Sequence, residues 1–155
     1  MREPDELTLV MVKPDGMQRR LLGTIIQRLE QKGLVMVAGD MRRLSYETAA
    51  KHYAAHQGKA FYQRLLKFIT SGPVFVCVWK GPSAVQRVRV LVGATSPEKA
   101  QPGTIRGDFA LHITQNLVHA SDSPAAAERE IRLFFPDTVF PDIIATDAEW
   151  LTPAE

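Results

Sequence analysis

The apolar run V-F-V-C-V-W, from Val74 to Trp79, constrains the fold more than any other stretch of this chain. Its odd and even positions are equally apolar, so the strand that it predicts, Val74 to Lys80, must be buried on both faces. The run L-T-L-V-M-V, from Leu7 to Val12, predicts a second buried strand near the start of the chain. We therefore expect both strands at the centre of a sheet.

Apolar residues at helical spacing predict helices between and after the strands. We expect helices at 23–32, around Tyr53 after an N-cap at Ser45, at 60–71, at 83–92 and from an N-cap at Ser123 to about Phe135, and two further strands at 34–44 and 116–120. This order of elements fits two architectures, a parallel doubly wound sheet and an antiparallel α+β sandwich.

The length of 155 residues fits a single domain covering 1–155, which can bury about two-thirds of its unfolded surface. Neither an internal repeat nor a low-complexity linker argues for a second domain. The segment from about 136 to 155 is rich in Pro, Asp and isolated apolar residues. We expect it to be a tail that lies over the domain or over a neighbouring subunit, with Trp150 as its anchor.

Composition excludes several classes of function. The 19 basic and 17 acidic residues give a net charge of +2, so no specific nucleic-acid partner is expected. Phe75 and Trp79 share one strand face, as stacking aromatics do in RNA-binding domains, but the sequence pattern of those domains is missing. The lone Cys77 favours a reducing setting. No apolar run approaches the roughly 18 residues of a membrane span, and a soluble cytoplasmic protein is expected.

The stretch from Pro102 to Ser123 concentrates the polar residues that chemistry requires. His119 follows the apolar pair Leu117 and Val118 and precedes a cluster of small polar residues, where a ring can be held rigidly beside a ligand. Neutral imidazole is available at pH 7 because its reference pKa is about 6.5, so His119 is a candidate nucleophile for a phosphoryl group. The alternative is a strand-end histidine that is satisfied by Ser121 or Asp122.

Two other groups of residues could bind ligands. Lys13 opens K-P-D-G directly after the first strand, where Pro14 and Gly16 stiffen the turn, and it is either a phosphate ligand or an ordinary exposed lysine. The P-loop pattern is absent. His52 and His56 have the i, i+4 spacing of metal ligands, but no completing ligand is evident, so we expect two exposed helix histidines.

Four motifs resemble those of the nucleoside diphosphate kinases, and they occur in that family's order. They are K-P-D-G at 13–16, S-G-P-V at 71–74, G-T-I-R-G-D-F at 103–109 and N-L-V-H-A-S-D-S at 116–123. The resemblance covers the chain from about Leu7 to Phe135 and implies a ferredoxin-like α+β sandwich with a four-stranded antiparallel sheet. One departure is Ala120, where the commonest family pattern has glycine, and alanine would be strained there if the backbone were left-handed.

The resemblance also implies an activity and a site. The activity is a ping-pong transfer of the γ-phosphoryl group from a nucleoside triphosphate to a nucleoside diphosphate, through a phosphohistidine on His119. Glu130 and Ser121 would orient that histidine, and Mg²⁺ would bridge the phosphates without a protein ligand. The nucleotide-binding residues implied are Lys13, Tyr53, Phe61, Leu65, Arg89, Thr95, Arg106, Ile113 and Asn116.

Several alternatives stay open from the residues alone. Phe61 stacks on a base in the implied site, which would tolerate every base, but it could equally pack in the core with Leu65. Arg89 could be a surface cation, and Asp122 is expected to hold the loop that carries His119. The competing function is a non-catalytic nucleotide-binding or signalling module of the same fold. The resemblance favours a homohexamer, with a tetramer as the alternative.

Overall fold

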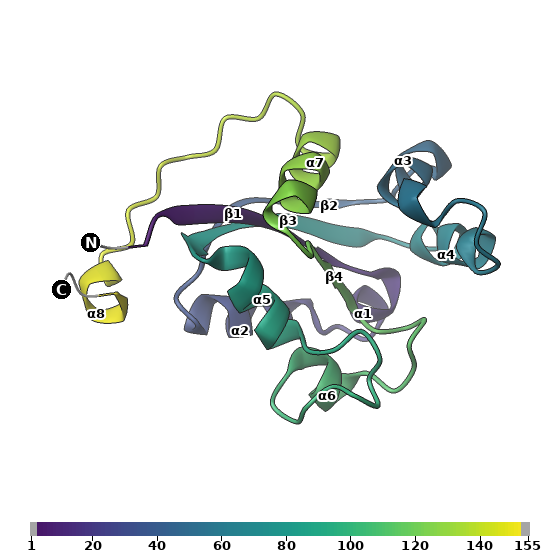
Figure 1. Ribbon diagram of the computed structural model, residues 1–155, viewed down its shortest axis with the longest axis horizontal. Helices are drawn as coiled ribbons and strands as arrows, with labels where there is room; N and C mark the ends of the chain where they lie inside the picture. The colour runs from purple at the N-terminus through teal and green to yellow at the C-terminus, as the bar shows by residue number, and fades with distance from the viewer. Residues whose placement is uncertain (1–2, 153–155) are drawn as a thin grey trace.

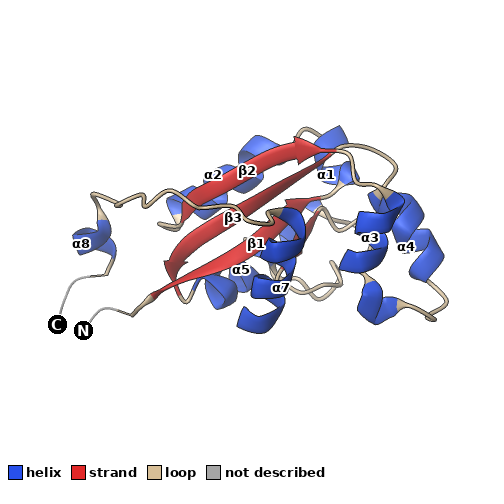
Figure 2. Cartoon of the chain, turned by 90° about the horizontal axis from the view of Figure 1, so that it is seen from above, coloured by secondary structure: helices blue, strands red, loops and turns tan. Residues whose placement is uncertain are grey.

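The computed structural model describes residues 3–152, in which four strands form one antiparallel sheet. The strands are β1 (Asp5–Val12), β2 (Val35–Arg42), β3 (Val74–Pro82) and β4 (Val118–Ala120), in the order β2-β3-β1-β4 (Figure 2). All three pairings are antiparallel, which confirms the ferredoxin-like architecture and excludes the parallel doubly wound sheet.

The two apolar runs form the two central strands, as the sequence predicts. Along β1, Val10 and Val12 enter one core while Leu9 and Met11 enter the other, and all four are fully buried. β3 alternates in the same way against β1 over eight residue pairs. The sheet is therefore covered on both faces.

The helices lie in two layers (Figure 1). One layer contains α2 and α5 with the short α1 and α6, and the other contains α3, α4 and α7. Their bounds are α1 Pro14–Gln18, α2 Leu22–Gln31, α3 Tyr46–His52, α4 Tyr62–Ile69, α5 Ala84–Val92, α6 Ile105–Phe109 and α7 Pro124–Phe134, with a 3-10 turn at Ala54–His56. α2, α4, α5 and α7 begin and end within two residues of the predicted positions. The helix predicted to carry Tyr53 ends one residue before it, and α1 and α6 were not predicted.

Side-chain caps fix where two of these helices begin. Ser45 Oγ accepts a hydrogen bond from the backbone N–H of Thr48, and Ser123 Oγ accepts one from Ala126, with Pro124 at the first helical position. Both caps were predicted, because serine satisfies backbone N–H groups that have no partner within the helix. The Ser123 cap matters for the site, because α7 begins directly after the strand that carries His119.

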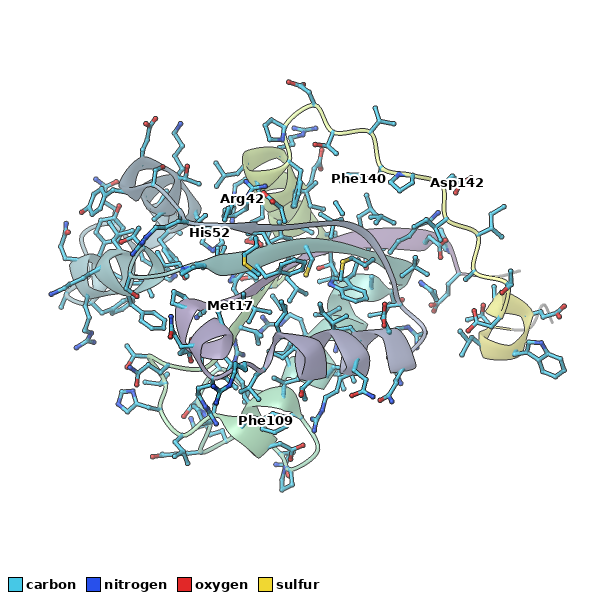
Figure 3. The ribbon with its side chains drawn as sticks, turned by 180° about the vertical axis from the view of Figure 1, so that it is seen from behind. Met17, Arg42, His52, Phe109, Phe140 and Asp142 are labelled. Atoms are coloured by element: carbon cyan, nitrogen blue, oxygen red, sulfur yellow. The ribbon has the colours of Figure 1, made fainter. Side chains whose placement is uncertain are left out.

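The tail runs from α7 across one side of the molecule to α8 (Ala148–Leu151), near the end of the sheet where β1 begins (Figure 1). Figure 3 labels Phe140 and Asp142 along it, and Asp142 lies 3.3 Å from the ammonium of Lys80. Trp150 is 82% exposed, so the prediction that it anchors the tail on this chain's own domain is wrong. Leu151 makes the contact instead, since its side chain lies over Gly33, where a Cβ atom would collide with it.

None of the helices within residues 3–152 is both long and apolar enough to cross a membrane.

Candidate active site

His119 lies at the middle of β4, paired with Met11 of the central strand β1. Its Nε2 atom is 2.8 Å from Oε1 of Glu130 on α7, and the Ser121 hydroxyl donates to the same oxygen at 2.8 Å. The remaining ring nitrogen, Nδ1, forms no hydrogen bond within the described chain. With the Nε2 proton donated to Glu130, Nδ1 carries the free lone pair.

Glu130 is suited to orient the ring of His119 because its carboxylate is buried and still ionised. Burial opposes its charge, but the hydrogen bonds from His119 and Ser121 outweigh burial and hold the pKa of the carboxyl below its usual value. Its carboxylate is 6% exposed, so water competes little for Oε1. A carboxylate in this position fixes both the tautomer and the orientation of the histidine ring.

Lys13 directly follows β1 and is 8% exposed, which contradicts the alternative of an ordinary exposed lysine. Its ammonium donates to Asn116 Oδ1 at 2.9 Å, and the Asn116 amide donates to the Thr95 carbonyl at 3.0 Å. Burial and the charge of Arg106 lower the pKa of Lys13 to about 8, although Asp15 opposes them. The ammonium thus stays charged at neutral pH in a partly dehydrated position.

The K-P-D-G turn is tied to Leu117, which directly precedes the histidine strand, by two hydrogen bonds. Asp15 Oδ2 accepts from the N–H of Leu117 at 3.0 Å, and the N–H of Lys13 donates to the Leu117 carbonyl at 2.8 Å. Gly16 has no room for a side chain, since a Cβ atom would lie 2.7 Å from Val12 Cγ1 and 3.0 Å from the Leu117 oxygen. Asp15 and Gly16 therefore hold Lys13 and His119 in one rigid unit, a role that the sequence analysis missed.

Arg106 is buried, and three of its guanidinium nitrogens hold the surrounding backbone. Nε, Nη1 and Nη2 donate to the carbonyls of Asn116, Gly93 and Val118 at 3.2, 3.1 and 2.6 Å. Burial, followed by the charge of Arg89, lowers the pKa of Arg106 to about 10, so it remains a cation at neutral pH. Arg89 is only half-buried, and its Nη1 makes one long contact of 3.5 Å to the Ala120 carbonyl.

A cleft of about 490 Å³ opens in front of His119. That volume lies within the roughly 300–1,000 Å³ of small-molecule sites. All the predicted nucleotide residues line it together with the histidine: Lys13, Tyr53, Phe61, Leu65, Arg89, Thr95, Arg106, Ile113, Asn116 and His119. Lys13, Arg64, Arg89 and Arg106 bring positive charge to the lining, while Phe61, 38% exposed, and Ile113, 54% exposed, offer apolar surface. Phe61 is therefore not an ordinary core residue.

The cleft also contains residues that the sequence analysis did not assign, namely His56, Arg64, Thr114, Ala120 and Asp122. The helical spacing from Phe61 could have indicated Arg64, but no pattern indicated Thr114. Asp122 was expected to hold the loop, yet it is exposed and faces the cleft. The φ angle of Ala120 is not positive, so its methyl group causes no backbone strain. Leu117, with φ of 74°, adopts the left-handed conformation instead.

The expectation of two exposed helix histidines is wrong for His52. His52 is 8% exposed, and its ring packs edge-on against the ring of His119 with the ring centroids 4.5 Å apart. The ring also contacts Tyr53 and Phe134, because α3 presses this face toward α7. His56 lies at the cleft, where its Nδ1 is 3.2 Å from the ammonium of Lys59.

Comparisons with known proteins agree on one family. The family model described as "Nucleoside diphosphate kinase" matches residues 6–140. A nucleoside diphosphate kinase of Archaeoglobus fulgidus is 53% identical over 94% of this chain and 97% of the relative, and one of Mycobacterium avium is 57% identical over 85% and 98%. The solved nucleoside diphosphate kinase of Halobacterium salinarum, in complex with CDP, is 51% identical and superimposes with a TM-score of 0.92 over 96% of this chain and 99% of that one.

Proposed function

The chain belongs to the nucleoside diphosphate kinase family, and from that premise we propose that His119 carries the phosphoryl group between two nucleotides. The overall activity is that of the family, a phosphotransferase that moves the γ-phosphoryl group of a nucleoside triphosphate to a nucleoside diphosphate. The matched relatives are enzymes by name, so they give no support to the non-catalytic alternative.

The observation that carries the proposal is the 2.8 Å hydrogen bond between His119 Nε2 and Glu130. It leaves the lone pair of Nδ1 available to attack the γ-phosphorus. An N–P bond forms, the bond between that phosphorus and the β,γ-bridging oxygen breaks, and the diphosphate leaves with the bonding electrons. A second diphosphate then attacks the phosphohistidine with its terminal oxygen and returns the lone pair to Nδ1.

Phosphoryl transfer requires aligned reactants and charge neutralisation more than covalent chemistry by the protein. We assign neutralisation of the phosphate oxygens to Lys13, Arg89 and Arg106, which all line the cleft. Tyr53 and Thr95 can donate to the same oxygens. The Tyr53 hydroxyl supports this assignment, because it is buried without a hydrogen-bond partner among the described residues.

The nucleoside is assigned to the other residues of the cleft. Phe61 and Leu65 offer a base the face of a ring and an apolar edge, Ile113 adds further apolar surface to the lining, and stacking of this kind distinguishes poorly between bases. Asn116 and Lys13 would bind the ribose hydroxyl. We therefore propose that purine and pyrimidine nucleotides are all accepted, with efficiencies that differ by no more than about two orders of magnitude.

We assign Mg²⁺ to the nucleotide phosphates. Mg²⁺ prefers oxygen ligands and usually keeps several waters while it bridges phosphates. The cleft fits such an ion, since its lining offers cations and a single carboxylate, Asp122, rather than a cage of protein oxygens. When bound, the ion neutralises charge on the phosphate oxygens. The protein's own residues align the γ-phosphorus with His119.

The decisive test uses radiolabelled ATP and Mg²⁺ without an acceptor. The protein should retain label as a phosphoramidate that is lost in acid and survives in base, and any nucleoside diphosphate should remove it. His119→Ala should abolish the label and lower exchange by several orders of magnitude, with nucleotide affinity little changed. His112→Ala, in an exposed loop, is the matched control. Acid-stable label, or substantial activity in His119→Ala, would refute the phosphohistidine.

We also propose a homohexamer rather than a tetramer. Several exposed apolar side chains support assembly, since Leu111, Val139 and Trp150 are 94%, 93% and 82% exposed on the isolated chain. Light scattering should give about six times the chain mass of 17.3 kDa. A monomer mass would contradict both assemblies.

We also propose that the chain forms a single domain and that the protein works in a reducing, cytoplasmic location. The buried free thiol of Cys77 is in keeping with that location.

A further inference from the structure

His52 has unsatisfied hydrogen-bonding groups in a buried position. Both ring nitrogens have no hydrogen-bond partner within the described chain, although only 8% of the residue is exposed. Figure 3 labels the side chain beside the sheet at the end where α3 lies. Buried polar atoms in folded proteins almost always have a partner, which can be a water molecule or an ion. The fold therefore leaves two buried ring nitrogens of His52 without a partner among the described residues, beside His119.

Two other ligand atoms converge on the same place. One nitrogen of His52, one of His119 and a carboxylate oxygen of Glu130 lie within 4.8 Å of one another. In a tetrahedral zinc site with bonds of about 2.0–2.2 Å, neighbouring ligand atoms are roughly 3.3 Å apart. The 2.8 Å contact between His119 and Glu130 would have to open slightly, and His52 would have to approach by a small rotation.

We propose that His52, His119 and Glu130 form a binding site for Zn²⁺, and that the bound ion stops phosphoryl exchange. Two imidazoles and one carboxylate are a donor set that zinc uses in proteins, with the fourth position left to water. Mg²⁺ is a poor occupant because it prefers oxygen ligands in octahedral geometry. The site is therefore separate in chemistry from the nucleotide's own Mg²⁺.

Binding requires a change of tautomer at His119. The Nε2 proton, which is shared with Glu130 Oε1, is exchanged through solvent for a proton on Nδ1, so the neutral ring binds the ion through the Nε2 lone pair and Oε1 binds it as a carboxylate oxygen. His52 contributes a neutral ring through one of its two nitrogens, which have no hydrogen-bond partner among the described residues. His119 loses the carboxylate that orients it, and its Nδ1 carries the ring proton while zinc is bound, so Nδ1 has no free lone pair with which to attack phosphorus.

The surroundings limit the affinity. Arg129 Nη2 lies 3.9 Å from Oε2 of Glu130. This cation repels a divalent ion, so the site should release zinc readily to a chelator. Zinc binding itself rests on the geometry of the three ligands. Inhibition rests in addition on the proposed role of His119 as the nucleophile.

Binding is tested by equilibrium dialysis of the nucleotide-free protein against Zn²⁺, with the metal counted per chain. The wild type should bind one ion per chain, and His52→Phe and His119→Ala should each weaken binding at least about tenfold. Phenylalanine keeps the ring contacts of His52 with Tyr53 and Phe134, and His52→Asn is a second variant. His112→Gln, in an exposed loop, should bind zinc like the wild type.

Two results would overturn the site: no saturable zinc binding by the wild type, or binding by folded His52→Phe or His52→Asn that matches the wild type. Circular dichroism establishes that each variant is folded.

Inhibition is tested as the ratio of exchange rates with and without Zn²⁺, in excess Mg²⁺ and with a chelator to restore activity. The ratio should fall at least about tenfold in the wild type and stay near one in His52→Phe, which also controls for zinc bound to nucleotide. Equal ratios in the two proteins would refute inhibition through this site. The metal-free phosphohistidine assay tests His119 separately, so a failure there is distinguishable from a failure to bind zinc.

Discussion

Glu130 on α7 accepts a 2.8 Å hydrogen bond from the ring of His119 on β4, and this one contact couples a helix to the strand that carries the proposed nucleophile. The helix begins three residues after Ser121, whose hydroxyl donates to the same carboxylate oxygen. The short connection between strand and helix therefore brings donor and acceptor together without a long loop.

Glu130→Gln tests that contact. We expect exchange to fall about 10- to 100-fold, because an amide lacks the charge that stabilises the His119 N–H and can favour the wrong tautomer. Nucleotide affinity should change little, since Glu130 does not line the cleft. Steady-state kinetics with a separate binding titration would check this. Weaker nucleotide binding with an unchanged rate of phosphoenzyme formation would contradict the orienting role.

The pH dependence should follow Lys13. Its pKa is about 8 in the folded protein, against 10.5 for an ordinary lysine, so the ammonium loses its charge as pH rises above 8. We expect kcat/KM to fall above that pH, while Arg106, with a pKa of about 10, keeps its charge at pH 9. Rates between pH 7 and 9.5 would check this.

Stability should move in the opposite direction over the same range. Between pH 8 and 10.5 the unfolded chain binds more protons at Lys13 than the folded chain does, so this residue makes stability rise with pH. Lys13→Met should remove that contribution and lower exchange at every pH.

For the activity itself, a flat profile of wild-type kcat/KM up to pH 9.5 would argue against Lys13 as the essential cation.

Phe61→Ala tests the base platform. Phe61 is 38% exposed at the cleft and sits 5.5 Å from the ring of His56. Losing a stacking surface costs about 1–3 kcal/mol per base, so KM should rise by roughly 5- to 150-fold for purine and pyrimidine nucleotides alike. Phe68→Ala, on the same helix outside the cleft lining, is the matched control for folding. Loss confined to one base would show that Phe61 reads base identity.

Arg106→Lys tests whether the guanidinium is a structural part of the site. A lysine can replace the charge but not three hydrogen bonds to the carbonyls of Gly93, Asn116 and Val118. Each buried acceptor left without a partner costs about 1–3 kcal/mol, so thermal unfolding should begin at a clearly lower temperature. Calorimetry would measure the change. Unaltered stability with weaker nucleotide binding would make Arg106 a phosphate ligand only.

The local properties of the chain were predictable from the sequence. The runs at Leu7–Val12 and Val74–Trp79 predicted the two central strands, because apolar residues at every position leave no face for water. Serine before an apolar helix predicted the N-caps at Ser45 and Ser123. Residue patterns alone did not decide between parallel and antiparallel strands. The resemblance to one family, carried by four motifs, gave the antiparallel sheet and the residues of the cleft.

Only the tertiary structure decided which side chains lose contact with water. His52 was expected to be exposed because no partner for it was evident in the sequence, but it is buried because α3 packs toward α7 and brings it against His119, 67 positions further along the chain. Trp150 has the large apolar side chain expected of an anchor, yet it is exposed, and Leu151 makes the contact with Gly33. Burial depends on which elements pack together, and sequence periodicity records only the preferred face of each element. The sequence thus determined the strands, the caps and the motif residues, while the packing between elements decided the environment of His52, Lys13 and Arg106.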